Sequence, residues 1–340
     1  MKFLLRAAAL ALAAYSGAPA AAAGKITIAI AGSDKIVYMP AKLAERLGYF
    51  QAQGLEVELR SEIAGIEARD GLLSGAVQGV VGFYDHTLAL QAKGKFVQSV
   101  VQFTVSPGEA ALVSTRLADT IRSPADFGGH NIGVTRLGSS TSFLIHYLAL
   151  AHGVKRHDLN IVPVGAGDPF ISAMREGLID AGMTTEPTIS RLLKTGEAKI
   201  LVDLRRPEDT ARMLGGLYPA ACLYMRSAWV ERNRPQVQSL ANALVSALVY
   251  IQTHTAEEIA AAMPAHYDAG DHALYVNAIA ASKAMFTVDG RMPASGPATV
   301  LRVMSAINHS VKDKDIDLAK TFTTDFVDAL RPKFQAAAAR

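Results

Sequence analysis

Short apolar strands alternate with helical stretches over residues 25–103, and this alternation restricts the possible fold more than any other feature of the chain. Within one predicted helix, Leu43, Leu47 and Phe50 share a single face. The strands are predicted at residues 25–30, 55–59, 79–83 and 96–103, with helices at 38–50, 66–73 and 85–92. Alternation of this kind predicts a largely parallel sheet whose faces are covered by helices.

The same alternation restarts near residue 110. Strands are predicted at 110–114, 131–135, 160–164, 180–183 and 198–202, and helices at 123–127, 140–152, 169–176 and 187–193. A further strand at 218–225 precedes a mostly helical remainder, at 235–254, 256–262, 273–286, 298–309 and 325–336. We therefore expect an α/β protein with two lobes around a ligand cleft. Lobe 1 would comprise residues 24–106 and 217–340, including a helical C-terminal extension, and lobe 2 residues 107–216.

The composition fits a folded two-domain chain and argues against nucleic acid as a partner. The 340 residues are 50% hydrophobic and 19% charged, which excludes intrinsic disorder as a description of the whole chain. The formal net charge is +3, and Lys2 and Arg6 supply two of these charges near the amino terminus. The remaining body is therefore close to neutral, whereas a nucleic-acid-binding protein needs a concentrated basic face.

The single cysteine, Cys222, excludes an intramolecular disulfide and any metal site built from several thiolates. It lies in an apolar, strand-like run. We expect a buried structural thiol rather than a reactive one.

The first 23 residues have the pattern of a secretory signal peptide. Lys2 and Arg6 form a positive region, residues 7–15 are apolar, and small residues follow from Ala18. We expect cleavage near Gly24 and a soluble periplasmic protein, although an uncleaved anchor is the alternative. No cysteine lies near the cleavage point, so the sequence predicts no lipid anchor.

Three motifs follow one another along the chain: the helix 38–50 with its Gly-Tyr-Phe end, followed by Gly54; the Gly-Ser loop at 138–141; and Asp180-Ala181-Gly182 with Glu186-Pro187. In this order they resemble the periplasmic substrate-binding proteins of ABC transporters, in the SsuA/TauA-like branch that binds nitrate, sulfonates, taurine and thiamine pyrimidines. The resemblance covers about residues 25–260 and implies a type II periplasmic-binding-protein fold that delivers a small molecule to an inner-membrane ABC permease. In this branch an aromatic residue commonly stands between Asp-Ala and Glu-Pro, where this chain has residues 182–185.

A serine-rich loop is the first candidate for ligand contact. Ser139, Ser140 and Thr141 follow the strand at 131–135 and stand at the start of a helix. A helix N-terminus offers free N–H groups and a partial positive charge, which suit an anion. The alternative is that these hydroxyls simply cap the helix.

Polar residues after two strands of lobe 1 are further candidates. Tyr84, Asp85 and His86 follow the strand at 79–83, and Ser33 and Tyr38 follow the first strand. These side chains are predicted to line the cleft. The alternatives are that Asp85 caps the next helix, that His86 is structural and that Tyr38 packs under its loop.

Thr185 and Glu186 complete the predicted site in lobe 2. Glu186 precedes Pro187, a favoured first residue of a helix, so its carboxylate either belongs to the capping region or meets a donor on the ligand. If both Glu186 and the serine loop face the cleft, the ligand has an anionic end and an amine or N–H end. An amino-sulfonate such as taurine, or a pyrimidine-like amine, fits this arrangement better than nitrate.

No motif for catalysis, a cofactor or a metal is found. The chain lacks the nucleophile-elbow, zinc-protease and phosphate-loop patterns, and its central histidines show no i, i+4 pair. We therefore predict a solute-binding protein without catalytic activity, cofactor or metal. The alternatives are an enzyme of the same fold, such as a pyrimidine-synthase relative, and a ligand-sensing protein that presents a surface to a receptor.

Overall fold

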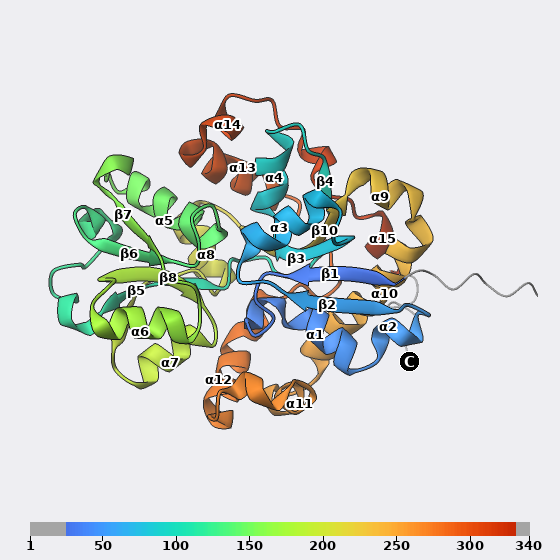
Figure 1. Ribbon diagram of the computed structural model, residues 1–340, viewed down its shortest axis with the longest axis horizontal. Helices are drawn as coiled ribbons and strands as arrows, with labels where there is room; N and C mark the ends of the chain where they lie inside the picture. Colours follow the sequence, from blue (N-terminus) through green and yellow to red (C-terminus); the bar gives the residue numbers. More distant parts are fainter. Residues whose placement is uncertain (1–24, 331–340) are drawn as a thin grey trace, which may run out of the picture.

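The computed structural model describes residues 25–330, whose strands form two separate five-stranded sheets (Figure 1). In the first sheet the order is β2–β1–β3–β10–β4, with β1 parallel to β2 and β3, and β10 antiparallel to both of its neighbours. Every residue of the central strand β3 is buried, as expected for a strand covered on both faces. The strands are β1 (Ile26–Ile30), β2 (Val57–Ser61), β3 (Gly79–Phe83), β4 (Val97–Gln102) and β10 (Ala221–Arg226).

The second sheet repeats this arrangement with the order β7–β6–β8–β5–β9. Here β6 is parallel to β7 and β8, whereas β5 runs antiparallel to β8 and β9. In both sheets the antiparallel strand is the first one that the chain forms after crossing from the other sheet. The strands are β5 (Glu109–Ser114), β6 (Asn131–Val134), β7 (Asn160–Pro163), β8 (Ala181–Thr185) and β9 (Ala198–Asp203).

Helices cover both sheets, and the two α/β lobes lie side by side in Figure 1. The long helix α10 packs against α1 and α2 in lobe 1, and α13 packs against α4 of lobe 1 and α5 of lobe 2. The α-helices are α1 (Met39–Arg46), α2 (Tyr49–Ala52), α3 (Gly65–Ser74), α4 (Asp85–Gln91), α5 (Ser140–Ala151), α6 (Asp168–Glu176), α7 (Thr188–Lys194), α8 (Pro207–Leu214), α9 (Ser227–Arg232), α10 (Arg234–Thr253), α11 (Ala256–Ala262), α12 (His272–Ser282), α13 (Gly296–Ile307), α14 (His309–Lys312) and α15 (Asp325–Asp328).

Two chain segments cross between the lobes and are hydrogen-bonded to each other. Tyr218 N donates to Val105 O at 3.1 Å, and Ser106 Oγ donates to Arg205 O at 2.9 Å. Gly108, in the first crossing, has φ +66°, and a Cβ there would come within 2.7 Å of Met285 Sδ. Both the backbone conformation and the lack of space therefore favour glycine at this position. We propose that the lobe boundaries lie near residues 106 and 216.

The predicted α/β fold with two lobes is confirmed, and the differences are local. The helix expected at 38–50 is interrupted at Gly48, whose φ of +71° ends α1 and redirects the chain into α2. The last predicted helix, 325–336, is helical only at α15 within the described residues. The predicted signal peptide lies outside the described residues. Among residues 25–330, no helix combines the length and apolar character needed to cross a membrane.

Candidate functional site

A small polar cavity of about 20 Å³ lies where the two lobes meet. Residues that follow or end β1, β3, β6 and β8 contribute to its walls, as expected for a site at the carboxyl ends of parallel strands. This volume accommodates roughly one water molecule, so a larger ligand requires the lobes to separate. The walls are formed by Lys35, Tyr38, Ala64, Gly65 and His86 from lobe 1 and by Glu109, Thr135, Ser139, Ser140, Thr141 and Thr185 from lobe 2.

Asp85, the first residue of α4, connects the lobes behind this cavity. Its side chain is fully buried and accepts hydrogen bonds from Ser140 Oγ at 3.0 Å and from Tyr218 OH at 3.2 Å. Burial raises the pKa of Asp85 to about 7, although the two hydroxyl donors act in the opposite direction. Asp85 is therefore a carboxyl group whose charge is sensitive to pH near neutrality.

Other polar contacts also cross between the lobes. Ile36 N donates to Glu186 O at 3.1 Å, and Arg136 forms an ion pair with Glu67 at 3.1 Å between Nε and Oε1. At another edge of the contact between the lobes, Lys194 of α7 forms an ion pair with Asp271, which precedes α12. The structure is therefore that of a closed cleft, held by contacts on several sides.

The serine loop lines the cavity, but its hydroxyls already have partners. Ser139 Oγ donates to Arg136 O at 2.7 Å, and Thr141 Oγ1 accepts from Thr135 N at 3.0 Å. Ser140 Oγ donates to the carboxyl of Asp85. The Ser139 side chain does not cap α5, so the simple capping alternative does not describe this loop.

His86 contributes a buried, neutral imidazole to the cavity. Burial, assisted by Arg69, lowers the pKa of His86 to about 3. Its Nδ1 lies 3.4 Å from Tyr224 OH, whereas Nε2 is buried without a hydrogen-bond partner. The ring packs edge-on against Phe143 of lobe 2, with the centroids 6.2 Å apart.

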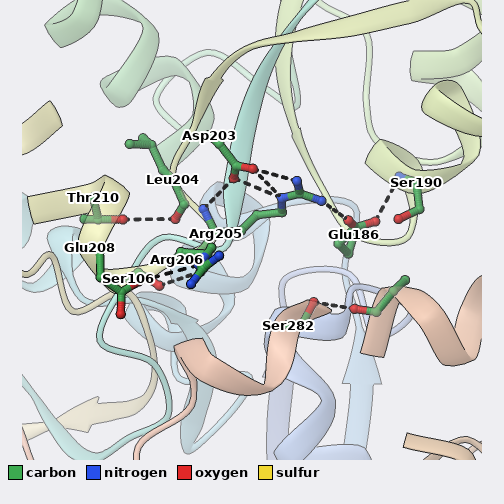
Figure 2. A network of polar contacts seen from close by, with 11 residues as sticks. Ser106, Glu186, Ser190, Asp203, Leu204, Arg205, Arg206, Glu208, Thr210 and Ser282 are labelled. Atoms are coloured by element: carbon green, nitrogen blue, oxygen red, sulfur yellow. Dashed lines mark hydrogen bonds and ion pairs between the residues drawn. The ribbon is translucent and has the colours of Figure 1, made fainter. Parts of the chain in front are cut away.

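Glu186 lies beside the cleft, but its carboxylate is engaged within lobe 2 (Figure 2). Oε1 accepts from Arg205 Nη1 at 2.7 Å, and Oε2 accepts from Ser190 N at 3.0 Å. Arg205 also contacts both carboxylate oxygens of Asp203. Burial raises the pKa of Asp203, but the bonds from Arg205 outweigh it and lower that pKa overall. Arg205 thus fixes two carboxylates, and the Glu186 backbone rather than its side chain contacts lobe 1.

Besides Asp85 and Glu186, two further predicted site residues, Ser33 and Tyr84, do not line the cavity. Ser33 is half-buried and lines an outer groove with Asp34, where its N–H donates to Ser61 Oγ at 3.1 Å. Tyr84 is buried and its hydroxyl bonds to Thr321 Oγ1, while its ring packs edge-on against Phe322. The structure therefore places Tyr84 against the C-terminal segment.

Three titratable residues that the sequence does not predict complete the site: Lys35, Glu109 and Tyr218. Lys35 is buried, and its Nζ donates to Ala31 O at 2.7 Å. Glu109 is the first residue of β5 and is only 2% exposed. A glutamate that opens an otherwise apolar strand is an unusual pattern, and this signal was available in the sequence.

Larger grooves of about 740 and 450 Å³ open on the outer margins between the lobes. They are bordered by exposed side chains, such as Leu137, which is 56% exposed. The small cavity instead contains buried polar atoms without a partner, namely His86 Nε2, Glu109 Oε2 and Thr185 Oγ1. Because such atoms are costly unless something pairs with them, we take the small cavity as the candidate ligand site.

The sequence profile of one protein family, described as "NMT1/THI5 like", matches residues 20–258. The chain belongs to this NMT1/THI5-like family. Its curated relatives include the 4-amino-5-hydroxymethyl-2-methylpyrimidine phosphate synthase THI13 of Saccharomyces cerevisiae. That protein is 26% identical over 239 residues, which cover 67% of this chain and 67% of the relative.

Solved structures extend the comparison for this NMT1/THI5-like protein. A protein from Bordetella bronchiseptica RB50 is 37% identical, with a TM-score of 0.87 over 92% of this chain and 98% of that one. The alkanesulfonate-binding protein SsuA from Xanthomonas axonopodis pv. citri, solved with bound MOPS, is 18% identical, with a TM-score of 0.71 over 90% of this chain and 100% of that one. The periplasmic nitrate-binding protein NrtA from Synechocystis PCC 6803 is 13% identical, with a TM-score of 0.70 over 92% of this chain and 88% of that one. These likenesses confirm the fold predicted from the sequence.

Proposed function

We propose that this protein is the periplasmic solute-binding component of an ABC import system. It would capture a small organic zwitterion or anion between its lobes and release it unchanged to an inner-membrane permease. The observation that carries the proposal is the buried polar cavity, whose walls come from both lobes and whose closure depends on bonds such as Ser140–Asp85.

The described cleft supports a ligand with a hydrogen-bond-donating end more than a bare anion. Lys35 and the N-terminus of α5 provide positive charge at the cavity, but Asp85 and Glu109 place two carboxyl groups beside it. A taurine-like zwitterion offers one end to each kind of group. An aminopyrimidine is the second candidate, favoured by the names of the yeast relatives, and nitrate is the least suited of the three.

Catalysis by an enzyme of the same fold is the alternative function, because the curated relatives are named as synthases. The residues around the cavity favour binding instead. Cys222 is fully buried in β10, where burial raises the pKa of its thiol, so it is poorly suited to act as a nucleophile.

Two measurements on one sample test this proposal. A thermal-shift screen of sulfonates, carboxylates, nitrate and pyrimidines first identifies a compound that binds. Small-angle scattering should then show that this compound makes the protein more compact, because binding closes the lobes. Mass spectrometry should recover the compound unchanged. Binding without any change in size would argue against closure, and conversion of the compound would favour the enzyme.

A further inference from the structure

Glu109 and Thr185 form a pair of buried oxygen atoms that face the cavity from neighbouring strands. They are directly opposite each other in the antiparallel pairing of β5 with β8, so their side chains lie on the same face of the sheet. Both residues line the cavity, and both Glu109 Oε2 and Thr185 Oγ1 are buried without a hydrogen-bond partner. Thr184, one residue earlier on β8, is not part of the cavity wall, in agreement with the two-residue period of a strand.

The titratable groups that face Glu109 come from lobe 1 and from the second crossing segment. Lys35 lies in the loop after β1, Asp85 begins α4, and the hydroxyls of Tyr38 and Tyr218 lie near both carboxyl groups. Burial and the neighbouring Asp85 raise the pKa of Glu109 well above its ordinary value, whereas Lys35 lowers it. Among the described residues that line the cavity, Lys35 is the one lysine or arginine, and burial lowers the pKa of its ammonium group.

This balance of charge distinguishes between classes of ligand. A bare oxyanion has no N–H donors for the buried oxygens, and it brings a negative charge beside two carboxyl groups whose ionisation burial already disfavours. A protonated amine or an amidine would bring a positive charge that favours the ionised form of Glu109, together with two or more N–H donors. Those donors match the two unpartnered oxygens of Glu109 and Thr185 in both number and kind.

We propose that Glu109 is the specificity-determining residue of the cleft, and that with Thr185 it selects ligands bearing a protonated amine or an N–H-rich group. This inference rests on the proposed function and names the part of the ligand that faces these two oxygens. The ligand's nitrogen donates to Glu109 Oε2 and Thr185 Oγ1. Any anionic end lies toward Lys35 and the N-terminus of α5.

Matched pairs of compounds test the inference, since each pair differs in one nitrogen group. Suitable pairs are taurine with isethionate, β-alanine with 3-hydroxypropionate, and 4-amino-2-methylpyrimidine with 2-methylpyrimidine; nitrate and methanesulfonate represent bare anions. Calorimetric titration of the full chain should show that, in at least one pair, the member with the amino group binds at least 10-fold more tightly than its partner. A hydrogen bond to a charged group contributes at least a 10-fold difference in affinity.

Variants then assign this preference to Glu109. Glu109→Gln keeps the shape and one acceptor oxygen but cannot ionise when a cation binds, so it should reduce the preference to less than about 3-fold. Glu109→Asp keeps a carboxyl group and should keep the preference at reduced affinity. Thr185→Val should weaken binding only of the member with the amino group. Glu56→Gln, at an exposed position before β2, is the matched control and should behave like the wild type. Thermal unfolding of each variant checks that it is folded, and Glu109→Asp carries the test if Glu109→Gln does not fold.

Several outcomes would overturn the inference. These are equal binding of both members of every pair, an unchanged preference in Glu109→Gln, or a panel whose binders include no compound with an amino group. Tight binding of nitrate or methanesulfonate with compaction of the protein would overturn the role of Glu109 and leave the proposed transport function intact. Chemical conversion of a bound amine would instead remove the transport function while leaving the selectivity in place.

Discussion

Replacing Asp85 by asparagine should make the protein more stable at alkaline pH and should remove much of its pH dependence. The side chain of Asp85 is fully buried, and burial raises its pKa from an ordinary value of 3.8 to about 7. At low pH the group is protonated in both the native and the unfolded chain. As the pH rises from about 4 to 7, the unfolded chain loses this proton while the native protein keeps it, so the free energy of unfolding decreases.

The size of this effect follows from the interval between the two pKa values. About 3 pH units at about 1.4 kcal/mol per unit give roughly 4 kcal/mol of stability lost by pH 7, after which the loss stays constant. In the Asp85→Asn variant the new amide oxygen would still accept from Ser140 Oγ, and the amide nitrogen could donate to Tyr218 OH. The variant loses the stronger hydrogen bonds that Ser140 and Tyr218 make to a charged carboxylate. The free energy of unfolding at pH 8 should therefore be about 2–4 kcal/mol higher in Asp85→Asn than in the wild type.

Thermal unfolding of the wild type and of Asp85→Asn from pH 5 to pH 8.5 measures this difference. At roughly 2–4 °C per kcal/mol, the variant should unfold several degrees higher at pH 8, and the gap should narrow toward pH 5. Asp119→Asn, at an exposed position in the same protein, is the control and should follow the wild type at every pH. Parallel curves for the wild type and Asp85→Asn, or a less stable variant at pH 8, would refute the reasoning.

Three further substitutions test how the cleft is built. Ser140→Ala removes the bond to Asp85 that joins the lobes, so ligand affinity should decrease by roughly 10- to 150-fold in calorimetry; unchanged affinity would remove this loop from the site. In Gly65→Ala the new Cβ would lie 2.6 Å from His86 Cε1, which should push the imidazole into the cavity and weaken binding at least several-fold. Gly71→Ala in the same helix is the control: its Cβ meets only an ordinary contact at 3.7 Å, so binding should be unchanged while stability rises by about 0.5–1 kcal/mol. If both variants changed the affinity equally, the contact between Gly65 and His86 would not explain the loss. Tyr84→Phe loses the bond to Thr321 and should cost about 0.5–1.5 kcal/mol in unfolding experiments, with no change in affinity; a loss of affinity would show that Tyr84 contacts the ligand after all.

The sequence alone determines the order of strands and helices and the edge of each sheet where a ligand site can form. Hydrophobic periodicity is a local property, so Leu43 and Ala44 identify a helical face, and the apolar run at β3 identifies a buried strand, without reference to the rest of the chain. The loops that follow parallel strands meet at one edge of a sheet. For this reason Tyr38, His86, Ser139 and Thr185 could be placed at the cavity from their positions in the sequence.

Only the tertiary structure decides which partner each polar side chain meets. Tyr84 bonds to Thr321, 237 residues away, and Glu186 is held by Arg205, so neither side chain is available in the way that its position after a strand suggests. Glu109 becomes a site residue because β5, formed as the chain crosses between lobes, is inserted antiparallel beside β8 and so faces Thr185. These contacts join segments that are separated along the chain, and no local pattern of residues encodes which segment each side chain meets.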